Sequence, residues 1–152
     1  PALGEITWRG FSIRDLKNEY FSNLTYIGHL SGTKDDLTVL ENLRISSALA
    51  GERISETQAR DALAYMGLNG REFLPAKVLS QGQRRRVALA RLLVCKTKLW
   101  ILDEPLAALD ITAVKLIQEL LERHLAEKGL VVMTTHQAID VAAISAVHLR
   151  LV

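Results

Sequence analysis

Residues 99–105 read LWILDEP, an unbroken run of four apolar residues that leads into two adjacent carboxylates and a proline. A short continuous apolar run is typical of a β-strand covered on both faces of a parallel sheet. Pro105 ends the run because proline cannot donate to a strand ladder. Ligands of open parallel sheets bind beyond the carboxyl ends of the strands. Asp103 and Glu104 are therefore candidate functional residues.

A helix and a second buried strand are predicted after this motif. Asp110 is a good N-cap, and the residues after it place an apolar stripe on one side of a helix over 111–127, made of Val114, Ile117, Leu121 and Leu125. The run 130–135, LVVMTT, predicts a buried strand that ends at His136. Strand, crossover helix and strand form a βαβ unit, which makes the two strands parallel and the connection right-handed.

The first part of the chain predicts a hairpin and a further strand. Residues 4–13 alternate in polarity around Gly10 and indicate two short strands that turn at this glycine. Residues 24–28, LTYIG, predict a strand that leads into His29 and the loop-like stretch SGTKDD. His29, the two carboxylates and His136 are thus all expected at the same edge of one sheet. Residues 138–145 predict a short final helix and residues 147–152 an edge strand.

The middle of the chain, from Thr38 to Cys95, has a helical pattern. SETQ at 55–58 is a capping box that predicts a helix over 56–66, stopped by Gly67. Residues 69–77 indicate a loop, and SQGQ at 80–83 opens a helix that is expected to run to about Cys95.

Composition narrows the class of protein. The 152 residues are 49% hydrophobic and 24% charged, which indicates one globular domain. A net charge of +2 is too weak and dispersed to predict a nucleic-acid partner or an anionic membrane surface. No apolar run approaches the roughly 18 residues needed to span a bilayer, so a membrane link is expected to run through a partner subunit. Cys95, the single cysteine, fits a reducing compartment and a packing role, and no Cys and His spacing matches a zinc site.

The acidic pair suggests hydrolysis. Adjacent side chains on a strand point to opposite sides of the pleat, so Asp103 and Glu104 cannot chelate one ion together. One carboxylate can hold Mg²⁺, directly or through its waters, while the other orients a water molecule and accepts its proton. The alternative interpretation is that the pair simply begins a surface loop after the strand.

The start of the helix at Ser80 has the features of an anion site. Ser80 and Gln83 form a capping box on their own, but glycine in the first helical turn costs about 1 kcal/mol relative to alanine. Gly82 is therefore expected where something approaches the backbone closely, and a phosphate at the positive helix end, with the Ser80 hydroxyl as a further donor, fits. Residues 84–86, three arginines, fan around the helix, which favours a solvated helix with a partner contact over a nucleic-acid surface.

Taken together, these motifs resemble the ATP-binding cassette (ABC) ATPases. LSQGQ at 79–83, LWILDEP, AALD at 107–110 and TTHQ at 134–137 are similar to that family's signature, Walker B, D-loop and switch-histidine motifs, in the same order. The resemblance implies an α/β ABC-type P-loop NTPase fold, with a RecA-like parallel sheet core and a helical signature subdomain. It divides the chain into a hairpin and Q-loop region (1–37), the signature subdomain (38–96) and a Walker B and switch-histidine part of the core (97–152). Residues 26–43 resemble the branch that serves haem export in cytochrome c biogenesis, in which His replaces the usual Q-loop glutamine.

The resemblance implies a role for each candidate residue with ATP and Mg²⁺ as ligands. Asp103 would hold Mg²⁺ through its water shell, Glu104 would be the general base, and His136 would contact the γ-phosphate. The residues implied to close on ATP bound to the other subunit of a homodimer are Ser80, Gly82 and Gln83. Asp110 would couple the two sites, and His29 would be a sensor that signals to the membrane permease subunits through residues 30–42. The implied location is peripheral, on the cytoplasmic face of the inner membrane.

One family motif is absent from the sequence. The 152 residues contain no GxxxxGK[ST] loop, which would cradle the ATP phosphates, and they begin at Pro1 in a segment that resembles the region just after that loop. We therefore expect a chain truncated at its N-terminus that hydrolyses little ATP alone. The alternative function is a non-catalytic, degenerate cassette that acts as a dimerisation or docking module. A DNA-repair relative is disfavoured because the insert between His29 and Ser80 is too short for a coiled coil.

The remaining histidines and Trp100 carry no expected function. His124 falls on the polar side of the predicted 111–127 helix and is expected to be solvated. His148 and Trp100 have no constellation of polar residues around them in the sequence.

Overall fold

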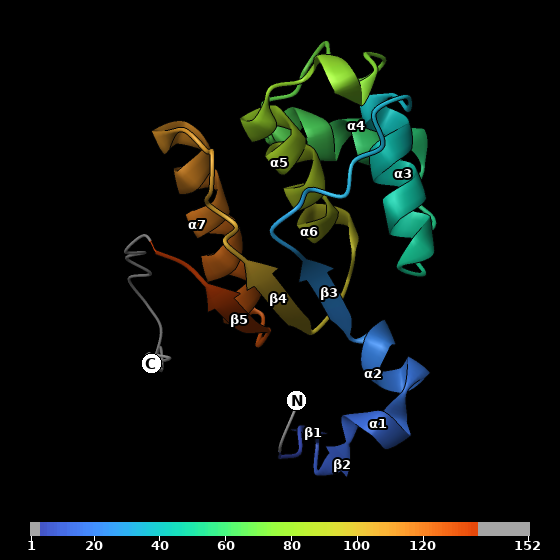
Figure 1. The fold of residues 1–152 in the computed structure, drawn as a ribbon, viewed down its shortest axis with the longest axis vertical. Coiled ribbons are helices and arrows are strands. Elements are labelled where there is room, and N and C mark those ends of the chain that lie inside the picture. Colours follow the sequence, from blue (N-terminus) through green and yellow to red (C-terminus); the bar gives the residue numbers. More distant parts are fainter. Residues whose placement is uncertain (1–3, 137–152) are drawn as a thin grey trace.

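A parallel three-stranded sheet forms the centre of the molecule (Figure 1). The structure is a computed structural model that describes residues 4–136. The sheet has the order β3 (Leu24–Ile27), β4 (Leu99–Asp103), β5 (Leu130–Thr134), and both pairs are parallel. The register pairs Ile27 with Leu102 and Asp103 with Thr134, so the three strands end at the same edge. This is the arrangement that the apolar runs predict.

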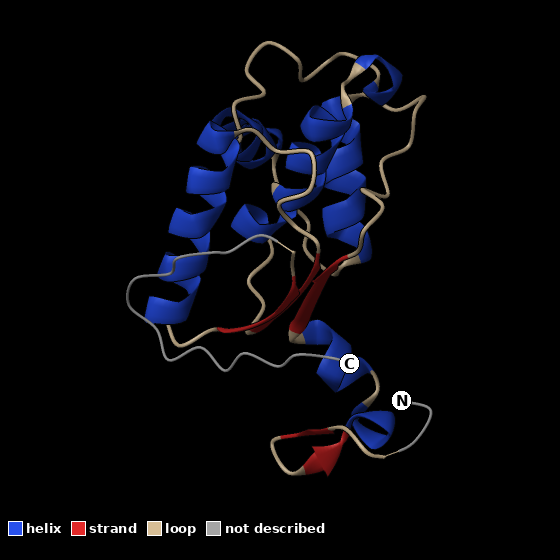
Figure 2. Cartoon of the chain, turned by 60° about the vertical axis from the view of Figure 1, so that its left-hand side comes forward, coloured by secondary structure: helices blue, strands red, loops and turns tan. Residues whose placement is uncertain are grey.

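Helix α7 (Ile111–Ala126) connects β4 to β5 and confirms the predicted βαβ unit. Figure 2 shows this helix running along one side of the sheet. The side chain of Asp110 caps it by accepting a hydrogen bond from the Ala113 N–H at 2.8 Å. Of the predicted stripe, Ile117 and Leu121 are fully buried, and Leu120 is buried beside them.

A group of helices covers the upper part of the molecule in Figure 1. It contains α3 (Val39–Leu49), α4 (Glu56–Tyr65), the 3₁₀ turn η1 (Ala76–Val78), α5 (Gln81–Leu89) and α6 (Arg91–Val94). The predicted capping boxes at Ser55 and Ser80 are both formed, and a third at Thr38 begins α3. The single helix expected from Ser80 to Cys95 is interrupted at Ala90, which separates α5 from α6.

The predicted hairpin is also confirmed. β1 (Thr7–Trp8) pairs antiparallel with β2 (Phe11–Ser12), and the connecting residues Arg9 and Gly10 have φ angles of 53° and 84°. Two successive positive φ angles are the requirement of a type I′ hairpin turn. Two short helices, α1 (Ile13–Leu16) and α2 (Asn18–Ser22), link the hairpin to β3. Neither was predicted, because four or five residues are too few to show a helical repeat.

The core is aliphatic and runs from the sheet into the helical group. Its fully buried members come from β3, α3, α4, β4 and α7, among other elements, and include Ile27, Leu43, Leu63, Leu102 and Ile117. β4 is covered on both faces, as predicted, with Leu99, Trp100 and Leu102 all buried.

The prediction that β5 is buried on both faces is wrong. Leu130 and Val132 are 54% and 57% exposed, whereas Val131 and Met133 pack against the core. β5 has only β4 beside it among the described strands, and α7 covers one of its faces. The sequence run LVVMT could not distinguish this half-covered strand from a fully covered one.

The solvated position expected for His124 is also wrong. Its ring stacks on the indole of Trp100, with centroids 3.7 Å apart and planes 7° from parallel. Burial lowers the pKa of the His124 imidazole. The ring also lies over Gly129, where a Cβ would be 2.2 Å from the histidine Nε2, so a larger residue there would have to displace the stacked ring. The cause is that the last turn of α7 packs on the sheet over Trp100.

Other predictions fall on residues that the structure does not describe. The final helix at 138–145, the edge strand at 147–152 and His148 lie outside the described residues. Within residues 4–136, no helix is both long enough and apolar enough to span a membrane.

Candidate functional site

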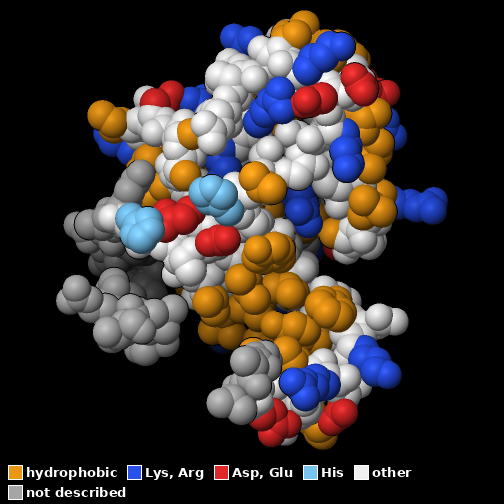
Figure 3. Space-filling view, in the orientation of Figure 1, with side chains coloured by type: hydrophobic (Ala, Val, Ile, Leu, Met, Phe, Trp, Pro, Cys, Tyr) orange, Lys and Arg blue, Asp and Glu red, His pale blue; other side chains and the backbone are white. Residues whose placement is uncertain are grey.

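The carboxyl ends of the three parallel strands bring the predicted polar residues to one edge of the sheet. His29 follows β3, Asp103 and Glu104 end β4, and His136 follows β5. Figure 3 shows histidine and acidic side chains gathered on one face of the molecule, beside the apolar surface of the lower part.

Asp103 is linked to the neighbouring strand through Thr134. The Thr134 hydroxyl donates to Oδ1 of Asp103 at 2.6 Å and accepts from the Glu104 N–H at 3.2 Å. One hydroxyl thus touches both residues of the acidic pair. No role is predicted for Thr134 from the sequence, although its position in TTHQ, in register with Asp103, could have indicated one.

Glu104 has a different partner, His136. The His136 Nε2 lies 3.4 Å from Oε1 of Glu104, and the His136 backbone N–H makes a long bond of 3.4 Å to Oε2. The backbone of Glu104 has a φ of 47°, an uncommon conformation for a residue with a side chain. Its N–H is nevertheless held by the Thr134 carbonyl at 3.1 Å. The two carboxylates therefore have separate partners, as two separate roles require.

His29 is exposed, and the segment after it is tied down by Asn42. The Asn42 amide group donates to the carbonyls of Lys34 at 3.0 Å, Leu37 at 3.2 Å and Thr38 at 3.0 Å. Its Oδ1 accepts from the Lys34 N–H at 2.7 Å. Asn42 is 7% exposed, and its role is not predicted because a polar residue within a helical run gives no sign of such a cluster of hydrogen bonds.

The three consecutive arginines do not form the solvated surface that the sequence favours. Arg84 pairs with Asp35 at 2.5 Å, in the segment that follows His29, and Arg86 pairs with Asp110 at 2.5 Å, at the start of α7. Arg85 is 4% exposed. The expectation was wrong because residues that fan around a helix reach a different neighbour in each direction.

Arg85 donates hydrogen bonds to four backbone carbonyls at the strand ends. Nη1 reaches Gly28 at 2.5 Å and His29 at 3.4 Å, Nη2 reaches Asp103 at 2.7 Å, and Nε reaches Pro105 at 3.2 Å. Burial lowers the pKa of the Arg85 guanidinium, and the negative charges of Asp103 and Glu104 oppose this shift. An arginine remains protonated under such conditions, so a buried positive charge lies beneath the acidic pair.

The start of α5 combines a cap with a close backbone contact. Ser80 Oγ accepts from the Gln83 N–H at 3.2 Å, and Gln83 Oε1 accepts from the Ser80 N–H at 3.0 Å. A Cβ on Gly82 would lie 2.5 Å from the carbonyl oxygen of Ala108. The close approach that Gly82 predicted therefore exists within the chain itself, between α5 and the turn after β4.

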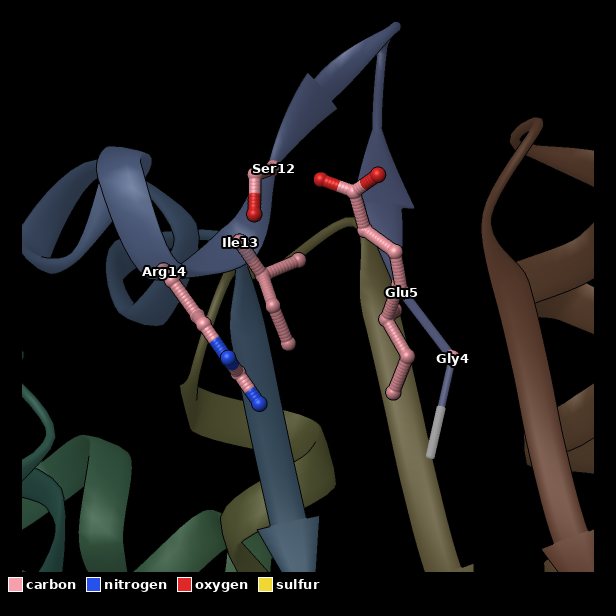
Figure 4. A pocket seen from close by; sticks show the side chains of 6 residues that line it. Gly4, Glu5, Ser12, Ile13 and Arg14 are labelled. Carbon is pink, nitrogen blue, oxygen red and sulfur yellow. The ribbon is translucent and has the colours of Figure 1, made fainter. Parts of the chain in front are cut away.

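No metal cage is formed within residues 4–136, where no group of three or more His, Cys, Asp and Glu side chains could hold an ion. A hollow of about 140 Å³ lies at the hairpin and contains Glu5 and Arg14 (Figure 4). The hairpin lies at the end of the molecule away from the strand ends (Figure 1), and no predicted site residue lines the hollow.

Comparison with known proteins decides the family. A model described as ABC transporter matches residues 1–107. The chain belongs to the ABC transporter family. It is 65% identical over 151 residues to the cytochrome c biogenesis ATP-binding export protein CcmA of Nitrosospira multiformis, a match that covers 99% of the chain and 73% of that protein. The protein of the same name from Nitrosomonas europaea is 62% identical, with 99% and 71% covered.

Solved structures agree with this assignment. A dimeric ATP-binding cassette in a post-hydrolysis state, bound to ADP and Pi, matches with a TM-score of 0.76 and 24% identity over 90% of the chain and 64% of that protein. An ATP-binding subunit of an ABC transporter matches with a TM-score of 0.73 and 25% identity, with 90% and 58% covered. The expected ABC-type α/β fold and the resemblance to the cytochrome c biogenesis branch are confirmed. Members of this cassette family are ATPases.

Proposed function

We propose that this cassette is the ATP-hydrolysing part of an exporter in cytochrome c biogenesis, with haem as the transported substrate. The observation that carries the proposal is the contact between Glu104 and His136, 3.4 Å apart beside Asp103 at the strand ends. The names of the relatives support the biological context. Haem itself follows from the resemblance of residues 26–43 to the haem-export branch.

Glu104 acts as the general base. Its carboxylate accepts the proton of the attacking water, and His136 on the neighbouring strand orients that water and contacts the γ-phosphate. The contacts of His136 with both carboxylate oxygens support this division of roles, because they hold the base toward the strand that carries the histidine. The Glu104 side chain is 20% exposed, so water can reach it.

Asp103 holds the Mg²⁺ that arrives with ATP. The Thr134 hydroxyl donates to Oδ1 at 2.6 Å, which leaves the second carboxylate oxygen for the ion or its waters. A single carboxylate with a neighbouring hydroxyl suits Mg²⁺, which prefers oxygen ligands and is usually shared between a protein carboxylate and substrate phosphates. The ion neutralises charge on the phosphates when it is bound.

The start of α5 serves ATP bound by a second copy in a homodimer. Ser80 Oγ accepts a bond from the Gln83 N–H, so its hydroxyl hydrogen is free to donate to a phosphate oxygen. Gly82 keeps this turn clear of side chains, and the positive end of the nine-residue helix favours an anion. Asp110 pairs with Arg86 of α5 and couples the two ATP sites of the homodimer.

His29 and the segment after it connect the cassette to its membrane partners. His29 is the sensor, and residues 30–42 carry its signal to integral membrane permease subunits. This places the cassette at the cytoplasmic face of the inner membrane, with no nucleic-acid partner. The division into 1–37, 38–96 and 97–152 assigns these tasks to the Q-loop region, the signature subdomain and the hydrolytic part of the core.

The test replaces the matching segment of the Nitrosospira multiformis relative with residues 1–152 and measures ATP turnover of the chimera. We expect turnover in the chimera and a loss of about 10² to 10⁴ in kcat with Glu104→Gln, with nucleotide binding retained. Residues 1–152 alone should show negligible turnover because they contain no GxxxxGK[ST] loop. Restored cytochrome c maturation in a strain that lacks its own ATP-binding export subunit is the matching test of the transport role.

The competing function is a non-catalytic docking module, in which the cassette assembles with the permease without hydrolysing ATP. A chimera that binds ATP and assembles with the permease, but turns over no ATP, would establish this alternative. Full activity of the Glu104→Gln chimera would instead remove Glu104 from the role of general base.

A further inference from the structure

Arg85 is the most deeply buried charged side chain at the candidate site. It is 4% exposed, and its guanidinium donates to carbonyls of Gly28, Asp103 and Pro105 at 2.5, 2.7 and 3.2 Å. These carbonyls belong to the end of β3, the end of β4 and the turn that follows β4. One side chain of α5 therefore joins the end of β3 to the end of β4 and the turn after it, which are far apart from β3 in the sequence.

Packing alone does not explain an arginine at this position. Burying a charge is costly unless hydrogen bonds compensate for the lost water, and an apolar side chain would fill the same space without that cost. The compensation here comes from backbone carbonyls, which have fixed positions once the strands are formed. A fork of fixed N–H donors suits such a set of acceptors, whereas a lysine offers a single point of charge.

Two of the carbonyls that Arg85 binds flank Glu104. Asp103 precedes Glu104 and Pro105 follows it, so the guanidinium binds the peptide directly before Glu104 and the peptide directly after Pro105. The φ of 47° at Glu104 is unfavourable for a side-chain-bearing residue and needs support from its surroundings. The hydrogen bonds from Arg85 to the Asp103 and Pro105 carbonyls supply part of that support. The Thr134 carbonyl supplies the rest by accepting a hydrogen bond from the Glu104 N–H at 3.1 Å.

We propose that Arg85 is a positioning residue for ATP hydrolysis, which clamps the turn that carries Glu104 to the end of β3 that carries His29. This inference rests on the proposed function, since it assumes that Glu104 is the general base. Arg85 touches neither ATP nor the attacking water. It acts by holding the backbone, and so a shift of the His29 segment moves the same guanidinium that holds the Glu104 turn.

The adjacent arginine extends this link. Arg84 pairs with Asp35, and the Lys77 N–H donates to the Asp35 carbonyl at 3.1 Å, in the segment that follows His29. Two neighbouring residues of α5 therefore contact the same segment at two points, at His29 and at Asp35. Through these contacts α5 is tied to the segment after β3 as well as to the strand ends.

The experiment compares Arg85→Met and Arg85→Lys in the chimera with the Nitrosospira multiformis relative. We expect Arg85→Met to lower kcat by about 10- to 100-fold, the usual cost of a misplaced catalytic group, while KM for MgATP changes less than about twofold. Arg85→Lys should recover part of kcat. Arg60→Met is the matched control, because Arg60 pairs with Glu56 and lies over the Phe73 ring, makes none of the contacts at the strand ends, and should leave kcat unchanged.

Hydrogen exchange gives a readout that does not depend on turnover. In Arg85→Met we expect protection to fall by at least about tenfold in peptides covering 28–30 and 103–106, with α7 unchanged, because only local opening is affected. Equal loss of protection in α7 would mean a general structural role and would overturn the proposal. So would wild-type kcat in Arg85→Met. If this variant does not fold, the same two readouts in Arg85→Lys decide.

The two proposals can fail separately. A chimera without any turnover contradicts the proposed function, and the exchange pattern then decides whether Arg85 is a clamp. Turnover that Glu104→Gln abolishes but Arg85→Met leaves intact supports the proposed function and overturns the role of Arg85.

Discussion

The carbonyl oxygen of Ala108 lies 2.5 Å from the point that a Cβ on Gly82 would occupy. Ala108 itself has a φ of 61°, so the turn after β4 is bent toward α5 in an uncommon conformation. The backbone of the signature helix and the backbone of the D-loop therefore touch directly. Glycine at position 82 is required by the chain's own packing, independently of any phosphate.

Gly82→Ala is predicted to destabilise the fold. Alanine favours a helix by about 1 kcal/mol over glycine, but here its methyl group meets a backbone carbonyl that must move, and overpacking of this kind costs about 1 to 3 kcal/mol. The cost of the clash with the Ala108 carbonyl should exceed the gain in helix propensity, so the urea midpoint of unfolding should fall. Gln81→Ala, one residue earlier, is the control and should stay within about 0.5 kcal/mol. A higher midpoint for Gly82→Ala would show that Ala108 moves freely.

Thr134→Val is predicted to loosen the acidic pair. Valine keeps the shape of threonine but removes the hydroxyl that donates to Asp103 at 2.6 Å and accepts from the Glu104 N–H at 3.2 Å. The expected loss of stability is about 0.5 to 1.5 kcal/mol, since these groups are partly solvated. In the chimera, kcat should fall by about tenfold or more, because the carboxylates are no longer held in register. Thr134→Ser keeps the hydroxyl and should retain most of the stability and most of kcat.

The stability of the chain is predicted to fall in mild acid because of His124. Burial lowers the pKa of this imidazole below its ordinary value of 6.5, so the folded chain binds fewer protons than the unfolded chain just below that pH. Its contribution is complete above about pH 6.5 and is lost as the pH falls toward the lowered pKa. Urea midpoints at about pH 7.5 and 5.5 measure this loss.

His124→Gln serves as the control for that measurement. Glutamine does not titrate, so the difference between the two midpoints should shrink relative to the wild-type chain. An unchanged difference would assign the acid sensitivity to groups other than His124.

The sequence predicts the sheet and its polar edge well because the signals are local. A run such as LWIL at 99–102 needs cover on both faces, and a carboxylate or histidine at its end must then lie at the edge where parallel strands finish. The capping boxes at Ser55 and Ser80 are formed for the same reason, since both partners lie within four residues.

The features that the sequence does not predict depend on contacts between distant residues. Arg85 reaches Gly28 across 57 positions, and nothing in three consecutive arginines indicates which one is buried. The stack of His124 on Trp100 is likewise set by the way α7 lies on the sheet. Such contacts depend on how helices pack on strands, and a pattern along one helix describes only that helix.

Asp110 is predicted to have two separable tasks. Its Oδ1 caps α7 through the Ala113 N–H at 2.8 Å, and its Oδ2 accepts from Arg86 Nη2 at 2.5 Å. Asp110→Ala should cost about 1 kcal/mol, because it removes the cap. Asp110→Asn keeps an equally good cap and weakens only a pair whose carboxylate side chain is 61% exposed, so its loss should be within about 0.5 kcal/mol. If Asp110 also couples two copies, the asparagine chimera should lose ATP turnover while its urea midpoint is preserved. Turnover that follows the midpoint in both variants would leave Asp110 with the cap alone.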